Sequence, residues 1–102
     1  MHVDGVGTKI LVAQMMNYFE PIGYDCVAMG VNDIICIGAK PVAFLDYLAV
    51  EKVNKKLITQ IAKGISKAAE ESGVYVLGNF FTADPFISLN VPLFCFFNQP
   101  FR

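Results

Sequence analysis

The chain has 102 residues, a length that suits one small domain. Its formal net charge is -1 and its lysines are scattered among acidic residues, which excludes the basic surface typical of nucleic-acid binding. Hydrophobic residues make up 55% of the chain, a high share that predicts a surface covered by a second domain or subunit. The most apolar stretch, residues 86–97, is shorter than the roughly 20 residues of a membrane-spanning helix, so we expect no membrane insertion.

The first half of the chain predicts two helices. An apolar-rich segment over residues 10–18 favours a short helix, which Pro21 ends. Asp25 is a suitable capping residue for a second helix over residues 26–37, and Gly38 stands just past its end. Because apolar residues occur nearly all round this second helix, we expect it to be buried on most sides.

The second half predicts a strand, a helix and another strand. The apolar run over residues 42–50 favours a mostly buried strand. Asn54 can cap the next helix, in which apolar residues repeat at helical spacing until Gly73 ends it. Residues 74–77 favour a short strand that leads to Gly78.

The composition changes sharply near residue 79. Seven of the nine phenylalanines lie between Phe80 and Phe101. Three prolines interrupt any helical or strand period in this part of the chain. We therefore predict two segments, an αβ domain over residues 1–78 and a phenylalanine-rich tail over residues 79–102.

Three cysteines, Cys26, Cys36 and Cys95, occur without the CxxC spacing of a metal or redox site. An odd number of cysteines with this spacing fits a reducing compartment, so we interpret them as small buried apolar residues. The start of the chain lacks the basic and apolar regions of a signal peptide. Together these features predict a cytoplasmic protein.

Three aspartates occupy positions where a carboxylate is costly. Asp33 lies in the apolar second helix, Asp46 lies in the apolar strand, and Asp4 precedes a glycine. An unpaired buried carboxylate is strongly unfavourable, so each of them needs a cation or hydrogen-bond donors. Lys9 is one candidate partner, and a divalent metal is another, because converging carboxylates are typical magnesium ligands. Local capping or exposure is the alternative for each aspartate alone.

The segment Asp4–Lys9, with the sequence DGVGTK, is the sharpest local pattern. Its two glycines let the backbone approach a phosphate, while Thr8 and Lys9 add a hydroxyl and a positive charge. It lacks the spacing of a Walker loop and the third glycine of a dinucleotide loop, so a plain glycine turn is the alternative. His2, the single histidine, could pair with Asp4, but a solvent-exposed chain end is the favoured interpretation.

Three stretches of the chain together resemble one family. DGVGTK at Asp4–Lys9, IGYDCVAMGVNDIICIGAKPVAFLDYL at residues 22–48 and VLG at Val76–Gly78 are similar to aminoimidazole ribonucleotide synthetase, also called phosphoribosylformylglycinamidine cyclo-ligase. The resemblance covers residues 3–78 in order and without a gap. Its FLDY element separates this family from relatives that make selenophosphate or phosphorylate thiamine phosphate.

The resemblance implies an α+β fold in which a mixed β-sheet is covered by two main helices. It also implies a homodimer of such domains. The implied activity is the ATP-dependent cyclisation of formylglycinamidine ribonucleotide to aminoimidazole ribonucleotide in purine biosynthesis. In that reaction ATP activates the amide oxygen, and a ring nitrogen then attacks the activated carbon. Positioned cations stabilise phosphoryl transfer, so the implied cofactors are ATP and Mg²⁺.

The same resemblance implies roles for individual residues. Asp4 and Asp33 would hold Mg²⁺. The residues that would contact the nucleotide are Gly5, Val6, Gly7, Thr8, Lys9, Asn32 and Asp46. Among these, Asn32 would support Asp33, and Asp46 would lie near the pocket. No residue is assigned as a general base.

The resemblance weakens after Gly78. The family continues with a second glycine and an ETAEMP-like segment that contributes to the active site, whereas this chain continues with NFFTADP at residues 79–85. Family chains are also longer at both ends, so we expect a fragment. The first hypothesis is an ATP-dependent ligase or its remnant, and the second is a catalytically inactive fragment that dimerises or binds a nucleotide. A different member of the same ATP-binding superfamily is disfavoured by FLDY.

Overall fold

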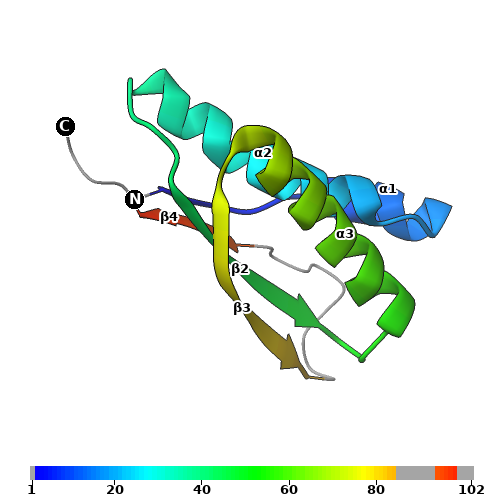
Figure 1. The fold of residues 1–102 in the computed structure, drawn as a ribbon. Coiled ribbons are helices and arrows are strands. Elements are labelled where there is room, and N and C mark those ends of the chain that lie inside the picture. Colours follow the sequence, from blue (N-terminus) through cyan, green and yellow to red (C-terminus); the bar gives the residue numbers. More distant parts are fainter. Residues whose placement is uncertain (1, 85–93, 99–102) are drawn as a thin grey trace.

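Two helices cover one face of a four-stranded sheet, and a third, short helix lies at one end of this layer (Figure 1). The computed structural model describes residues 2–84 and 94–98. The fold is α+β, as predicted. In chain order its elements are β1 (His2–Asp4), α1 (Lys9–Met16), α2 (Glu20–Cys36), β2 (Ala43–Val50), α3 (Lys55–Ser72), β3 (Tyr75–Ala83) and β4 (Phe94–Asn98).

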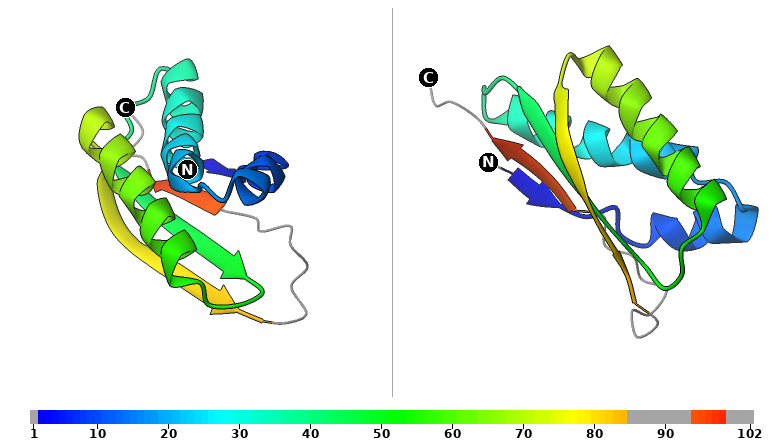
Figure 2. Two further views of the ribbon diagram at one scale, coloured as in Figure 1. Left: turned by 90° about the vertical axis from the view of Figure 1, so that its right-hand side faces the viewer. Right: turned by 60° about the horizontal axis from the view of Figure 1, so that its bottom comes forward.

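The sheet is mixed and has the strand order β1-β4-β2-β3. β2 and β3 run parallel, because α3 returns the chain to the start of the next strand, whereas β4 pairs antiparallel with both β1 and β2. Helices α2 and α3 lie on the same side of the sheet in two further views (Figure 2). This arrangement confirms the predicted mixed sheet beneath two main helices.

Helix α2 begins at Glu20, six residues before the predicted start. Phe19 is its N-cap, and Pro21 lies in its first turn, where the missing N–H of a proline costs no hydrogen bond. The predictions that Pro21 ends the preceding helix and that Asp25 caps this one are therefore wrong. Helix α1 instead ends at Met16, and its C-cap Asn17 adopts a left-handed φ of 52°. Gly38 follows α2 as predicted, with a φ of +72°.

The end of α2 is more exposed than its apolar composition indicated. Val27 and Ile34 are buried, but Ile35 and Ile37 are 56% and 78% exposed. The predicted burial on most sides is therefore wrong for this end of the helix. No helix in the described part of the chain is long and apolar enough to cross a membrane.

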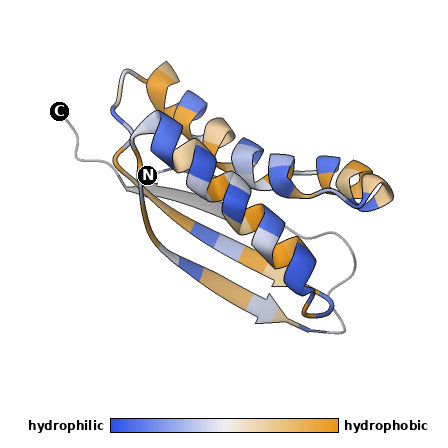
Figure 3. Ribbon diagram, turned by 45° about the vertical axis from the view of Figure 1, so that its right-hand side comes forward, coloured by the Kyte–Doolittle hydropathy of each residue, from blue (hydrophilic) through white to orange (hydrophobic). Residues whose placement is uncertain are grey.

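Helix α3 follows the predicted pattern. The Oδ1 atom of Asn54 accepts a hydrogen bond from the Leu57 N–H at 3.3 Å, and Gly73 follows the helix with a φ of +69°. Its apolar side is buried in the core at Ile61 and Ile65. Figure 3 shows hydrophilic and hydrophobic residues alternating along this helix, as expected when one side faces solvent.

Helices α2 and α3 pack with their backbones in direct contact. A Cβ atom added to Gly23 would lie 2.1 Å from the carbonyl oxygen of Ile61. A Cβ atom added to Gly64 would lie 2.0 Å from the carbonyl oxygen of Glu20. Only glycine leaves room for an approach this close, so these two positions set the distance between the helices.

The core lies between the sheet and the two main helices, and Phe44 and Ile34 are among its most deeply buried side chains. Cys26 is also buried there, but it is disulfide-bonded. Cys36 is free and exposed. The interpretation of the cysteines as small buried residues is therefore confirmed for Cys26 in its burial and wrong for the exposed Cys36, while the side chain of Cys95 lies outside the described part.

Strand β3 is longer than the predicted strand over residues 74–77 and continues past residue 79 without a break. It forms an edge of the sheet, and Figure 3 shows mainly hydrophobic residues along it. An exposed, hydrophobic edge strand is prone to pair with another chain. Its large exposed apolar side chains are Tyr75, Val76, Leu77, Phe80 and Phe81. What the sequence indicated for residues 85–93 and 99–102 lies outside the described residues.

Candidate functional site

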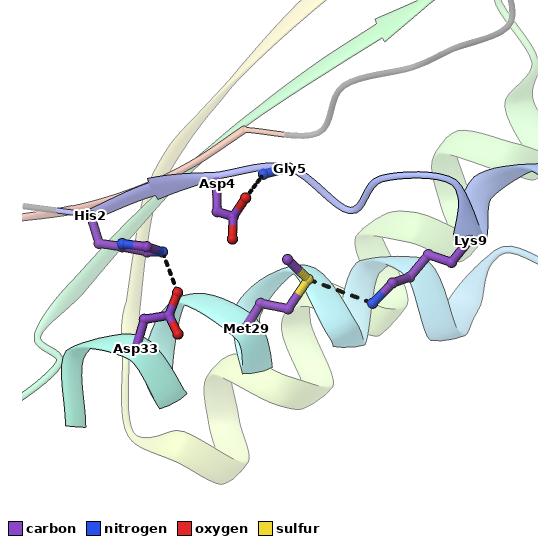
Figure 4. A network of polar contacts seen from close by, with 6 residues as sticks. All are labelled: His2, Asp4, Gly5, Lys9, Met29 and Asp33. Atoms are coloured by element: carbon purple, nitrogen blue, oxygen red, sulfur yellow. Dashed lines mark hydrogen bonds and ion pairs between the residues drawn. The ribbon is translucent and has the colours of Figure 1, made fainter. Parts of the chain in front are cut away.

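Strand β1 and helix α2 bring three metal-ligating side chains to one point. His2 and Asp4 are two residues apart on β1, so their side chains leave the same face of the strand. Asp33 projects from α2 toward that face (Figure 4). One ligand atom from each of the three residues lies within 4.8 Å of the other two. We call this group the His2–Asp4–Asp33 cluster; it contains both aspartates for which the resemblance implies a metal.

His2 takes part in this cluster and is not a solvent-exposed chain end. Its Nε2 atom lies 2.8 Å from Oδ2 of Asp33, and its side chain is only 28% exposed. The Nε2 atom itself is buried, and in spite of that short distance it makes no hydrogen bond within the described residues. We therefore describe the contact with Asp33 as an ion pair that depends on imidazole protonation. The ion pair that His2 forms is with Asp33 and not with Asp4.

Only one of the three aspartates singled out above is buried. Asp46 is 5% exposed, whereas Asp4 and Asp33 belong to the exposed residues. The sequence argument that a buried carboxylate needs a cation or hydrogen-bond donors therefore does not apply to Asp4 or Asp33. Their proximity gives a different reason, because two nearby carboxylates repel each other and a cation between them is electrostatically favourable.

The loop between β1 and α1 leaves donors available for an anion. The Gly5 N–H donates to Oδ1 of Asp4 at 2.8 Å, which holds that carboxylate against the loop. Gly7 adopts a φ of +67°, which favours glycine. Thr8 is the N-cap of α1, but its side chain makes no capping hydrogen bond, so the first N–H groups of the helix lack a side-chain acceptor. A helix start of this kind suits a phosphate group.

Lys9 extends along α2 instead of joining the cluster (Figure 4). Its Nζ atom lies 3.2 Å from Oδ2 of Asp25 and 3.6 Å from the sulfur of Met29. The suggested pairing of Lys9 with the singled-out aspartates is therefore not observed. The ion pair with Asp25 is partly exposed and contributes less than about 1 kcal/mol, so it can be exchanged for a phosphate contact. Val6 is 3% exposed and offers the loop only its backbone groups.

Asn32 lines a groove between α2 and α3, together with Tyr24 and Glu71. Consecutive residues of a helix point about 100° apart, because a turn holds 3.6 residues. Asn32 therefore faces α3, whereas Asp33 faces β1.

Asp46 lines a cavity of about 330 Å³ between α3 and the β2–β3 pair. The walls are mainly apolar, with Ile61 and Ile65 from α3 and Phe81 from β3, while Asn79 adds a polar group. Burial raises the pKa of the Asp46 carboxyl from 3.8 to about 6, and a hydrogen bond with the backbone of the same residue limits the rise. Of the singled-out carboxylates, only Asp46 has the burial that the sequence argument required.

Asp4 and Asp46 share one row of the sheet. Cys95 of β4 is the register partner of Asp4 on one side and of Asp46 on the other, and Asn79 of β3 is the next partner along. Register partners face the same side of a sheet, and two strand spacings correspond to about 10 Å. The Asp46 carboxylate thus lies on the same side as the cluster, but with one strand between them.

The comparison with known families gives a match over residues 1–92 to the family described as AIR synthase related protein, N-terminal domain. The match includes residues beyond the composition change at 79. The phosphoribosylformylglycinamidine cyclo-ligase of Pyrococcus horikoshii is 56% identical over 75 residues, which are 74% of this chain and 22% of that protein. The protein of the same name from Methanothermobacter thermautotrophicus is 47% identical over 93 residues, 91% of this chain and 28% of that protein. The chain thus spans about a quarter of the length of these relatives.

Solved structures show a similar fold. Thiamine monophosphate kinase from Aquifex aeolicus superposes with a TM-score of 0.67 at 22% identity, over 76% of this chain and 26% of that one. The hydrogenase maturation protein HypE in complex with ATP superposes with a TM-score of 0.64 at 21% identity, over 72% of this chain and 23% of that one. At these identities the likeness establishes the fold, and the family follows from the sequence match. The chain therefore belongs to the AIR synthase related protein family and corresponds to its N-terminal domain.

Proposed function

We propose that this chain is the nucleotide-binding part of a cytoplasmic, ATP-dependent cyclo-ligase, which converts formylglycinamidine ribonucleotide to aminoimidazole ribonucleotide in purine biosynthesis. One observation carries the proposal: Asp4 and Asp33 converge beside a glycine loop that leads into the start of α1. The relatives named phosphoribosylformylglycinamidine cyclo-ligase support the reaction. The ATP in the HypE complex, a protein of similar fold, supports the nucleotide.

The donor set of the cluster fits a divalent cation. Its ligand atoms lie within 4.8 Å of one another, so only small side-chain adjustments would bring them around a single ion with metal–oxygen bonds of about 2.1 Å. Asp4 and Asp33 would hold Mg²⁺, which when bound supplies positive charge against the phosphate oxygens. The other contacts to the nucleotide would come from side chains and backbone groups of this chain.

The loop residues would bind and orient the phosphates. The Gly7 and Thr8 N–H groups and the first turn of α1 are donors at a helix start. Lys9 would exchange Asp25 for a phosphate oxygen, because its ion pair with Asp25 is partly exposed and weak. We assign Asp46 to the edge of the nucleotide site, since it shares a sheet row with Asp4.

The replacement Asp33→Asn is expected to weaken Mg-ATP binding at least about tenfold, because it removes a charged ligand and keeps the size of the side chain. Isothermal titration calorimetry of the purified chain measures this affinity. Glu70→Gln is the matched control, since it removes the same charge at an exposed position on α3. An unchanged affinity in Asp33→Asn, or an equal loss in Glu70→Gln, would count against the proposal.

The alternative function is a nucleotide-binding fragment without catalysis, and strand β3 favours it for this polypeptide alone. Where the family has a second glycine and an ETAEMP-like segment, this chain has NFFTA within β3, so the expected glutamate is not in place. The same preparation separates the two candidates. Mg-ATP binding without formation of aminoimidazole ribonucleotide favours the fragment, and formation of that product establishes the ligase.

We propose that a second copy of the chain covers the hydrophobic edge formed by β3. The strand is nine residues long and exposes large apolar side chains along its length. Two identical edges related by a two-fold axis form a self-complementary interface. Such a homodimer accounts for the high hydrophobic content of the chain.

The replacement Phe80→Asp is expected to convert this dimer into a monomer, since it places a charge in the interface. Phe80 is 60% exposed, so the isolated fold tolerates the change. Sedimentation velocity measures the oligomeric state. Met15→Asp is the matched control, because Met15 is 87% exposed on α1 and lies outside the β3 edge. A Phe80→Asp protein that still sediments as a dimer would refute the proposed interface.

A further inference from the structure

We propose that His2 is a direct ligand of a divalent transition metal, held together with Asp4 and Asp33. The inference rests on the proposed metal role of the two aspartates and adds a nitrogen donor to an all-oxygen set. The DGVGTK pattern begins at Asp4 and gives His2 no function. His2 is assigned as a ligand only because its position on β1 brings it into the cluster.

The strand that positions Asp4 also positions His2. Alternate residues of a strand share a face, and β4 holds β1 in register by pairing with both residues. The imidazole and the two carboxylates then meet within 4.8 Å, although Asp33 comes from a different element. Ligand atoms of one ion, bound at about 2.1 Å, lie roughly 3 to 4 Å apart. The three side chains therefore need only small adjustments to share an ion.

The Nε2 atom of His2 contacts Asp33 closely but forms no directed hydrogen bond with it. It is buried and lies 2.8 Å from Asp33, but it makes no hydrogen bond within residues 2–84 and 94–98. A bound metal would give this nitrogen a directed partner, because neutral imidazole ligates a metal through its ring nitrogen.

Lys9, at the start of α1, is paired with Asp25 and not with the cluster. Its ammonium lies 3.2 Å from Asp25 and therefore leaves the carboxylates of Asp4 and Asp33 to another cation. A divalent metal supplies the charge that Lys9 does not. Protonated His2 would supply a single charge at most.

An imidazole ligand changes which metal the cluster prefers. Mg²⁺ favours six oxygen ligands and retains several waters, whereas Mn²⁺, Co²⁺, Ni²⁺ and Zn²⁺ accept imidazole nitrogen readily. His2 therefore raises the affinity for transition metals relative to Mg²⁺. It acts as a selectivity determinant at the nucleotide site.

Mn²⁺ alone, without nucleotide, is the probe that tests this inference. The chain is prepared without a histidine tag and with ¹⁵N only in histidine side chains. Because the chain contains one histidine, any ¹⁵N hyperfine coupling to bound Mn²⁺ in pulsed EPR comes from His2. We expect this coupling in the wild-type protein. Thiolates are poor ligands for Mn²⁺, so the exposed Cys36 does not compete.

The variants His2→Ala and His2→Gln give a second readout by calorimetry with each metal. The dissociation constant of Mn²⁺ is expected to rise about tenfold, while that of Mg²⁺ changes less than about twofold because its oxygen ligands remain. Circular dichroism melts verify that both variants fold. An equal loss of affinity for the two ions would show that His2 only supports the fold and would overturn the inference.

The outcomes also separate this inference from the proposed function. Mn²⁺ that binds without ¹⁵N coupling overturns the ligand assignment of His2 and leaves the aspartates as ligands. Wild-type protein that binds neither Mn²⁺ nor Mg²⁺ overturns the metal role of Asp4 and Asp33, and with it the assignment of His2.

Discussion

Replacing Gly64 by alanine is expected to lower the free energy of unfolding by about 3 kcal/mol. The added Cβ atom would lie 2.0 Å from the carbonyl oxygen of Glu20 and 2.7 Å from the backbone nitrogen of Tyr24. Neither backbone atom can retreat unless α2 moves as a whole. Alanine is the better helix former by about 1 kcal/mol, so the clash has to outweigh an intrinsic gain.

Urea denaturation followed by circular dichroism measures this loss of stability. Gly23→Ala, which places a Cβ atom 2.1 Å from the Ile61 carbonyl oxygen, is expected to behave in the same way from the other helix. Lys67→Ala, at an exposed position on α3, is the control and is expected to change stability by less than about 0.5 kcal/mol. A Gly64→Ala protein as stable as the wild type would show that the helix backbones are not in contact.

Replacing Asp46 by asparagine is expected to stabilise the protein at pH 8 by about 2 kcal/mol. The amide has nearly the same size and carries no charge into the apolar cavity under α3. The pKa of Asp46 is raised from 3.8 to about 6 in the folded protein, which means that the fold disfavours the charged form. A difference of about two pKa units sets a limit of roughly 3 kcal/mol on the effect.

The pH dependence of stability identifies the buried charge as the cause. Between pH 3.8 and about 6 the folded protein binds more protons at Asp46 than the unfolded chain does. The stability contributed by Asp46 therefore falls as pH rises through this window and is lowest above it. The gain in Asp46→Asn is expected at pH 8 and is expected to disappear near pH 4.

Urea denaturation of both proteins across this pH range provides the measurement. Glu51→Gln is the control, because it removes an exposed carboxylate and is expected to leave the pH profile unchanged. A gain in Asp46→Asn of the same size at pH 4 and pH 8 would mean that charge burial is not its source. The expected gain would mean that the wild-type chain keeps a destabilising carboxylate, as binding sites do.

Local signals in the sequence were sufficient for some elements and misleading for others. Helix α3 was predicted with its limits because Asn54 caps its start and Gly73 follows its end. Helix α2 was placed too late, because Pro21 is compatible with both a break and a first turn. The length of β3 was missed because pairing with β2, and not local alternation, carries the strand past residue 79.

The parts of the candidate site that lie close together in the sequence were predictable, whereas contacts between separate elements were not. The DGVGTK loop and the apolar setting of Asp46 are visible in the sequence. The approach of Asp33 to β1 depends on how α2 packs on the sheet, which no local pattern specifies. His2 was missed, although its two-residue spacing from Asp4 places both side chains on one face when the segment is a strand.

The glycine contact between α2 and α3 has a consequence for ligand binding. α2 carries Asp33, α3 covers the cavity that Asp46 lines, and backbone contact at Gly23 and Gly64 leaves the helices no slack to slide past each other. The carboxylates of Asp33 and Asp46 are therefore held at fixed positions relative to each other. A ligand that reaches both would find them already in place, so little ordering entropy would be lost when it binds.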